Sequence, residues 1–173
     1  KSIAKKNDCV LVFDEITSGF KDNYGGIHLK LKINPDIAIF GKSIGNGYPI
    51  SAIIGKKNIM EVSQDTFMSS TMWTDRLGFI AGVETLKKLK KYKVNKVISN
   101  YGSIIKNGWL KIAKKHKIDV SVSGLDSIIY LKFNYSNNSE IMTYFTQEML
   151  NKGYLAGSQV ATSFAYNKII INN

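Results

Sequence analysis

The sequence has little cysteine and little arginine, and no long apolar run. The single cysteine, Cys9, excludes an internal disulfide framework and a cysteine-rich metal site, and its apolar surroundings indicate a small buried side chain. Arg76 is the one arginine among 24 basic residues. Arginine supplies the bidentate base contacts of specific nucleic-acid recognition. No apolar run approaches the roughly 18 residues that a membrane helix needs. We therefore expect no nucleic-acid partner, no membrane partner and no metal.

The sequence does have enough apolar residues to form a core, and it has a large excess of lysine. With 173 residues, of which 44% are hydrophobic, it can form one sizeable domain or two small ones. The net charge of +11 comes mostly from lysines in residues 87–96 and 106–117, where helical spacing favours solvated helix faces. A basic binding module without catalysis is the alternative that this charge supports. The first residues, KSIAKKND, have no hydrophobic signal core, so the expected compartment is the cytoplasm.

Three short apolar runs predict strands at residues 9–13, 37–40 and 50–54. Runs without alternation are typical of strands buried on both faces, in a parallel or mixed sheet covered by helices. The first run ends at Asp14 and the second is followed by Lys42. Ligands of such sheets gather at the carboxyl ends of the strands, so both charged residues are candidates for a site.

The second half of the sequence has the pattern of a small α+β domain. Predicted elements are helices at 76–90, 94–112 and 137–153 and strands at 127–133, 160–166 and 169–172. The helix at 76–90 would join this half to the first.

A lysine among glycines, as in FGKSIGNGYPISAIIG at residues 40–55, has three possible chemistries. A phosphate-binding P-loop needs glycine five positions before the Gly-Lys-Ser, where the sequence has Asp36. A dinucleotide fingerprint is met only in part, and Pro49 lies where its helix should begin. An ATPase whose Walker B strand is VLVFDE stays open as an alternative.

The third chemistry is a Schiff base between Lys42 and pyridoxal phosphate. A nucleophilic lysine must be neutral for part of the time, and the cofactor needs a carboxylate that keeps its pyridine nitrogen protonated. Asp14 and Lys42, at the ends of two strands, can supply this pair. Alternation along the strand puts Ile16 on the same side as Asp14, where it can lie against the cofactor ring.

Four segments, FDEITSGFK, PDIAIFGKSIGNGYPISAIIG, SSTMWTDRLGFIAGVETL and FTQEMLNKGYLAG, resemble one family in order and spacing. It is the class III pyridoxal-phosphate aminotransferases, in their glutamate-1-semialdehyde aminomutase-like branch. The resemblance implies fold type I. Residues 1–85 would be the later part of a large cofactor domain, with a mainly parallel sheet and helices on both faces, and residues 86–173 a small C-terminal α+β domain.

The resemblance also implies a role for individual residues. Lys42 matches the lysine that forms the Schiff base and shuttles the proton, Asp14 the aspartate on the pyridine nitrogen, and Ile16 the residue packed on the ring. Thr71 matches a threonine that reaches the cofactor phosphate of the neighbouring subunit, and Ser70 is the residue next to it. The working unit would then be a homodimer with active sites at the interface.

The sequence departs from the family at Lys21, where arginine is usual, and at Asn46, where glycine is common. Both are expected to lie outside the chemistry. His28 and His116 have no spaced metal-ligand partners, which predicts ordinary surface or loop residues.

The resulting prediction is an aminotransferase that passes an amino group from an amino donor to a carbonyl acceptor. A glutamate-1-semialdehyde-type aminomutase is the first alternative, although SSTMWTDR differs from the Gly-Thr-x-Ser-Gly-Asn-Pro form of aminomutases. The loop that cradles the cofactor phosphate is not found, so the chain is expected to be the C-terminal part of a longer enzyme.

Overall fold

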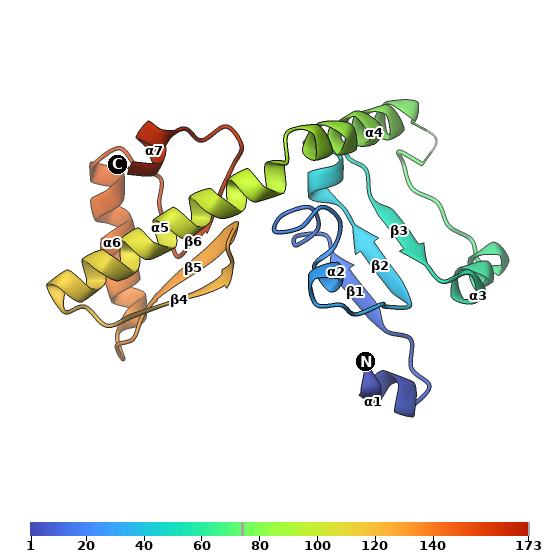
Figure 1. Cartoon of the computed structure of the whole chain (residues 1–173), viewed down its shortest axis with the longest axis horizontal. Coiled ribbons are helices and arrows are strands. Elements are labelled where there is room, and N and C mark those ends of the chain that lie inside the picture. The colour runs from blue at the N-terminus through green and yellow to red at the C-terminus, as the bar shows by residue number, and fades with distance from the viewer. Residues whose placement is uncertain (74, 173) are drawn as a thin grey trace. The chain divides into compact units, whose positions relative to one another are not determined.

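The computed structural model describes residues 1–73 and 75–172, which form two compact units, residues 1–95 and 96–173 (Figure 1). The predicted domain division after residue 85 stays a prediction. The first unit contains α1 (Ser2–Lys6), β1 (Val12–Glu15), α2 (Ile27–Lys30), β2 (Ile37–Phe40), the 3-10 helix η1 (Lys42–Ile44), β3 (Ala52–Gly55), α3 (Lys57–Met60), η2 (Glu61–Asp65) and α4 (Arg76–Lys91). From the unit boundary onward follow α5 (Val94–His116), β4 (Val120–Leu125), β5 (Ile128–Phe133), α6 (Asn138–Asn151), β6 (Gln159–Ala161) and α7 (Lys168–Asn172).

The first unit is built on a three-stranded sheet in the order β1-β2-β3 (Figure 1). β1 runs parallel to β2, with Asp14 opposite Ile39. β3 runs antiparallel to β2, with Ala52 opposite Phe40. The sheet predicted to be mainly parallel is therefore mixed. The connection of residues 41–51 contains only one turn of 3-10 helix, whereas a parallel crossover needs about a dozen residues or more and usually an α-helix.

The strands of this sheet are not covered equally. Ala38 and Phe40 of the central strand are buried. Val12 of β1, and Ile53 and Ile54 of β3, are about half-exposed. Within the described residues, the two outer strands thus keep apolar side chains in solvent.

The core of the first unit lies beside the candidate lysine. Ala38, Phe40 and Ile44 form its buried cluster, and the partly buried residues packed against it are Phe20, Ile50, Ala52 and Leu86. Ile44 follows Lys42 by two positions, so burial of Ile44 fixes the chain segment from which Lys42 extends.

The second unit pairs a wholly antiparallel sheet, β4-β5-β6, with helices. Its core is drawn from β5 and α5 and consists of Ile128, Ile129, Leu131, Phe133, Ile98 and Ala113. The Thr162 hydroxyl, just after β6, donates to the carbonyl of Ile98 in α5 at 2.7 Å. None of the helices in residues 1–73 and 75–172 is both long and apolar enough to cross a membrane.

Three local predictions differ from the structure. The segment at 169–172, predicted as a strand, lies in α7, because Asn167 Oδ1 accepts a hydrogen bond from Ile170 N at 3.0 Å and so begins a helix. β4 was marked only by the alternation of Val120 and Val122 and was not predicted. Cys9 is exposed, since β1 begins only at Val12 and Cys9 still belongs to the turn after α1.

Candidate functional site

Asp14 and Lys42 leave the same edge of the sheet, at the carboxyl ends of the two parallel strands. Asp14 lies in β1 opposite Ile39, and Lys42 begins η1 two residues after β2 ends. The exposed Asp14 carboxylate accepts a hydrogen bond from Ile16 N at 3.0 Å, and no ion pair engages it among the described residues. The edge therefore presents a carboxylate and an amine on neighbouring strands, as the sequence predicts.

Lys42 has an unusual backbone and a defined side-chain partner. Its φ of +42° lies in the left-handed region, which residues other than glycine rarely adopt. Its Nζ donates a hydrogen bond to Thr17 Oγ1 at 2.7 Å. Partly buried Ile16 lies beside Gly41, the residue before this lysine, since a Cβ added to Gly41 would be 3.4 Å from Ile16 Cγ2. The structure thus brings Asp14, Ile16 and Lys42 to one edge.

The loop after Lys42 is braced by α4. Asn46 and Gly47 both have positive φ, so the chain turns sharply there. The Tyr48 hydroxyl donates to Asp75, which caps α4 by accepting a hydrogen bond from Leu77 N at 2.8 Å. The hydrogen bond from the Tyr48 hydroxyl lowers the pKa of Asp75, which favours the ionised carboxylate. The positive N-terminal end of the helix dipole stabilises this negative charge.

Glu15, the residue after Asp14, is fully buried and holds the loop before the lysine. Its Oε1 accepts from His28 N at 3.0 Å and lies 2.9 Å from His28 Nδ1. Its Oε2 accepts from the Ser18 hydroxyl. Burial raises the pKa of Glu15, but hydrogen bonds from Ser18 and from the first residues of α2 outweigh it, so this pKa lies below its ordinary value.

His28 is wrongly predicted as a surface or loop residue. It lies in α2 and is 9% exposed, because its imidazole and its backbone N–H serve as partners for the buried Glu15 carboxylate. The ring also packs edge-on against Phe13 and Phe40, with centroids 5.8 Å and 6.3 Å away. Among the residues that the structure describes, no cluster of three or more His, Cys, Asp or Glu side chains could hold a metal ion.

Two residues near Lys42 were missed by sequence reasoning. No local pattern marks Thr17, because its contact joins residues 25 positions apart. The expectation that Lys21 lies outside the chemistry stays a prediction. Burial lowers the pKa of Lys21, and the positive charge of Lys42 lowers it further, so the two ammonium groups are close enough to interact.

Ser70 and Thr71 are the remaining predicted site residues. Both are exposed, in the segment before α4, where Trp73 N donates to Ser70 O at 3.1 Å. No hydrogen bond within the described residues joins either side chain to Asp14 or Lys42. Thr74, in the same motif, lies outside the described residues. The predicted contact with a neighbouring subunit's cofactor phosphate stays a prediction.

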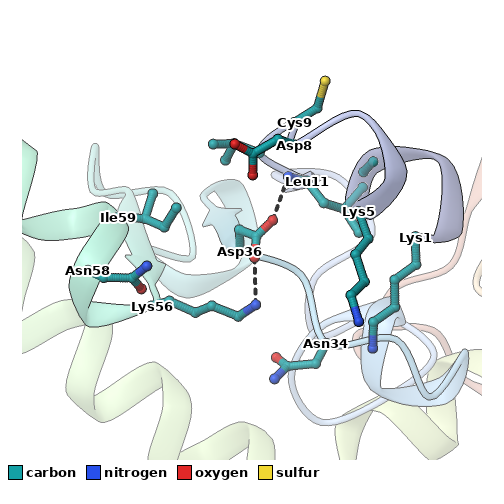
Figure 2. Close-up of a pocket in the computed structure, with 12 residues that line it drawn as sticks. Lys1, Lys5, Asp8, Cys9, Leu11, Asn34, Asp36, Lys56, Asn58 and Ile59 are labelled. Carbon is teal, nitrogen blue, oxygen red and sulfur yellow. Dashed lines mark hydrogen bonds and ion pairs between the residues drawn. The ribbon is translucent and has the colours of Figure 1, made fainter.

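A cavity of about 340 Å³ lies at the opposite end of β1 and β2 (Figure 2). At its centre Asp36 accepts hydrogen bonds from Leu11 N at 2.8 Å and from Lys56 Nζ at 2.6 Å. Asp36 thereby ties the start of β1 to the residue after β3. Neither Asp14 nor Lys42 lines this cavity, so the candidate site is the exposed edge and not the cavity.

The whole chain has the fold of transaminases of known structure. FumI from Sphingopyxis sp. MTA144, in its PLP internal aldimine form, matches with a TM-score of 0.90 at 21% identity, over 99% of this chain and 42% of FumI. An omega-transaminase from Sphaerobacter thermophilus matches with a TM-score of 0.87 at 18% identity, over 99% of this chain and 43% of that one. The fold is therefore that of the fold-type-I transaminases.

Sequence comparison identifies the family. A family model for Aminotransferase class-III matches residues 1–164. A 3-aminobutyryl-CoA aminotransferase from Cloacimonas acidaminovorans is 31% identical over 134 residues, 77% of this chain and 32% of the relative. A glutamate-1-semialdehyde 2,1-aminomutase from Ruminiclostridium cellulolyticum is 32% identical over 178 residues, 94% of this chain and 41% of the relative. The chain belongs to the class-III aminotransferase family and spans about a third to two-fifths of the length of these relatives.

Proposed function

We propose that the edge formed by Asp14, Ile16 and Lys42 is the pyridoxal-phosphate side of an aminotransferase active site. The protein would move an amino group from an amino donor to a carbonyl acceptor. One observation carries the proposal: a carboxylate and an amine leave the carboxyl ends of adjacent parallel strands, where sheets of this kind bind ligands. Membership of the class-III aminotransferase family supports this interpretation over a Walker B strand.

The groups at this edge fit the cofactor by their chemistry. Asp14 is exposed and has no ion pair within the described residues, so its carboxylate can hold a protonated pyridine nitrogen. Lys42 supplies an exposed primary amine. When bound, pyridoxal phosphate supplies an aldehyde that condenses with amines and a protonated ring that withdraws electrons from the attached carbon.

Each residue then has a distinct task. The negative charge of Asp14 keeps the ring nitrogen protonated, because separating that proton from a nearby carboxylate costs electrostatic energy. Ile16, packed against Gly41, would offer an apolar surface to the cofactor ring. Lys42 Nζ takes a proton from the substrate carbon and returns it, as a base and an acid in turn.

The assembly and the surroundings are also proposals. Ser70 and Thr71 would bind the cofactor phosphate of a neighbouring subunit in a homodimer, which their exposure before α4 permits. Residues 86–173 would act as the small C-terminal domain. The exposed thiol of Cys9 favours a reducing compartment such as the cytoplasm.

An aminomutase, which keeps both exchanged groups on one substrate, is the second candidate. It is supported by the similarity to glutamate-1-semialdehyde 2,1-aminomutases, one of which is 32% identical over 94% of this chain. Turnover that needs no separate amino donor would select the aminomutase, and turnover that needs both donor and acceptor would select the aminotransferase.

The direct test uses the full-length protein with pyridoxal phosphate. The wild type should show the visible absorption band of the attached cofactor, and borohydride reduction should leave the cofactor mass on the Lys42 peptide. Lys42→Ala should lose the band and the turnover, whereas Lys111→Ala, at an exposed lysine of α5, should keep both. An unchanged band and undiminished turnover in Lys42→Ala would overturn the proposal.

A further inference from the structure

The amine of Lys42 is held by a hydroxyl to which no motif assigns a role. We propose that Thr17 is a positioning residue for Lys42, and that a buried clamp of Glu15, Ser18 and His28 keeps Thr17 in place. This inference rests on the proposed function, in which Lys42 is the reacting amine. It concerns how the amine is held before any reaction begins.

The contact itself restricts a flexible side chain. Lys42 Nζ donates to Thr17 Oγ1 at 2.7 Å, and both residues are exposed. An exposed lysine otherwise samples many rotamers, and ordering it costs entropy during each reaction. A hydroxyl that accepts from Nζ selects the rotamers that keep the amine above the strand edge, so part of this cost is met before the reaction.

Thr17 can act in this way because its own turn is rigid. Gly19 N donates to Glu15 O at 2.8 Å, which closes a turn with Thr17 at its middle. The Ser18 hydroxyl donates to the Glu15 carboxylate within the same turn. A Cβ on Gly19 would lie 2.6 Å from Glu15 O and 2.8 Å from the Phe40 ring, so the turn is packed against the core.

The clamp fastens this turn to α2. Glu15 is 0% exposed, and its carboxylate is bound by Ser18 on one side and by His28 on the other. Buried carboxylates with several donors are costly to disrupt, because each abandoned donor loses its partner. The Glu15 carboxylate has no bond to Lys42 in the described residues, and the turn that it fastens carries Thr17, so the clamp acts on the amine through Thr17.

The first experiment measures how fast the full-length apoprotein attaches pyridoxal phosphate at Lys42. Attachment joins Nζ to the aldehyde carbon with loss of one water, and borohydride at timed intervals adds hydride to the carbon–nitrogen double bond and stops the process. Mass spectrometry then gives the modified fraction of the Lys42 peptide, with Lys111 as the background lysine. This readout does not depend on turnover.

Thr17→Val should slow attachment about fivefold, the ratio that the loss of one ordinary hydrogen bond of about 1 kcal/mol produces. Thr17→Ser keeps the hydroxyl and should stay within about twofold of the wild type. Equal rates for Thr17→Val and wild type would overturn the inference while leaving the proposed function intact. A wild type that attaches no cofactor at Lys42 would overturn both.

The second experiment tests the clamp by a double-mutant cycle. Ser18→Ala removes one donor to Glu15 and should slow attachment of the cofactor. Ser18→Thr keeps the hydroxyl and should attach the cofactor about as fast as the wild type. If the clamp acts through Thr17, the double variant Thr17→Val/Ser18→Ala should be no slower than Thr17→Val alone. Multiplied effects of the two changes, with circular dichroism like that of the wild type, would contradict the clamp.

Discussion

The left-handed backbone at Lys42 makes a prediction that separates conformational strain from lysine chemistry. Replacing Lys42 by alanine or by glycine removes the amine and its bond to Thr17 in both cases, so these losses cancel in the comparison. The two variants differ in the energetic cost of the backbone conformation, because φ is +42° at this residue. At this φ the Cβ of alanine clashes with the backbone, whereas glycine has no Cβ. Lys42→Gly should therefore be more stable than Lys42→Ala by about 1 kcal/mol.

The assay is urea unfolding of the two full-length apoproteins, which compares their free energies of unfolding without bound cofactor. Lys111, exposed within α5, provides the matched control. In a helix interior the order reverses, and Lys111→Gly should be less stable than Lys111→Ala by about 1 kcal/mol. If alanine is as stable as glycine at position 42 while position 111 behaves as expected, the strain argument is refuted.

Three further outcomes follow from the loop and from one helix. Because the pKa of Glu15 is lowered by folding, the unfolded chain binds this proton more tightly than the folded chain does. The free energy of unfolding should therefore fall as the pH drops from the ordinary pKa of glutamate through the lowered pKa of Glu15. Urea unfolding at a series of pH values from neutral to acid should show a smaller loss in Glu15→Gln. Gly19→Ala should destabilise the protein by about 2 kcal/mol in thermal or urea unfolding, since its Cβ would be 2.6 Å from a backbone oxygen, and a neutral effect would mean that the turn can shift. Gly108→Ala should instead stabilise α5 by about 0.5–1 kcal/mol, because nothing lies within 4 Å of the new Cβ, and a lower melting temperature would contradict this.

The placement of Asp14 and Lys42 at one edge of the sheet could be predicted from the sequence because it depends on local patterns. Each follows or ends an apolar run, and parallel strands align their carboxyl ends. The course of β3 could not be predicted in the same way. Its apolar run is compatible with either direction, and the short connection of residues 41–51 decides for the antiparallel one.

The supporting residues of the candidate site could not be predicted from the sequence, for a different reason. Thr17 contacts Lys42 across 25 positions of chain, and a turn closed by backbone hydrogen bonds decides that Thr17 faces the lysine. The charge of Lys42 acts on Lys21 across 21 positions of chain. His28 is buried because it binds the buried Glu15 carboxylate, and the local sequence around His28 gives no sign of this contact. Such contacts follow from tertiary packing.

Under the proposed function, Lys21 would affect the chemical selectivity of this edge. An arginine at this position would keep its charge at every ordinary pH and would not condense with aldehydes under mild conditions. Lys21 has a lowered pKa, so it becomes a neutral amine at a lower pH than a solvent-exposed lysine does. Under the proposed function, a carbonyl compound that binds here would encounter a second primary amine, and adducts on Lys21 would be a side reaction that an arginine avoids.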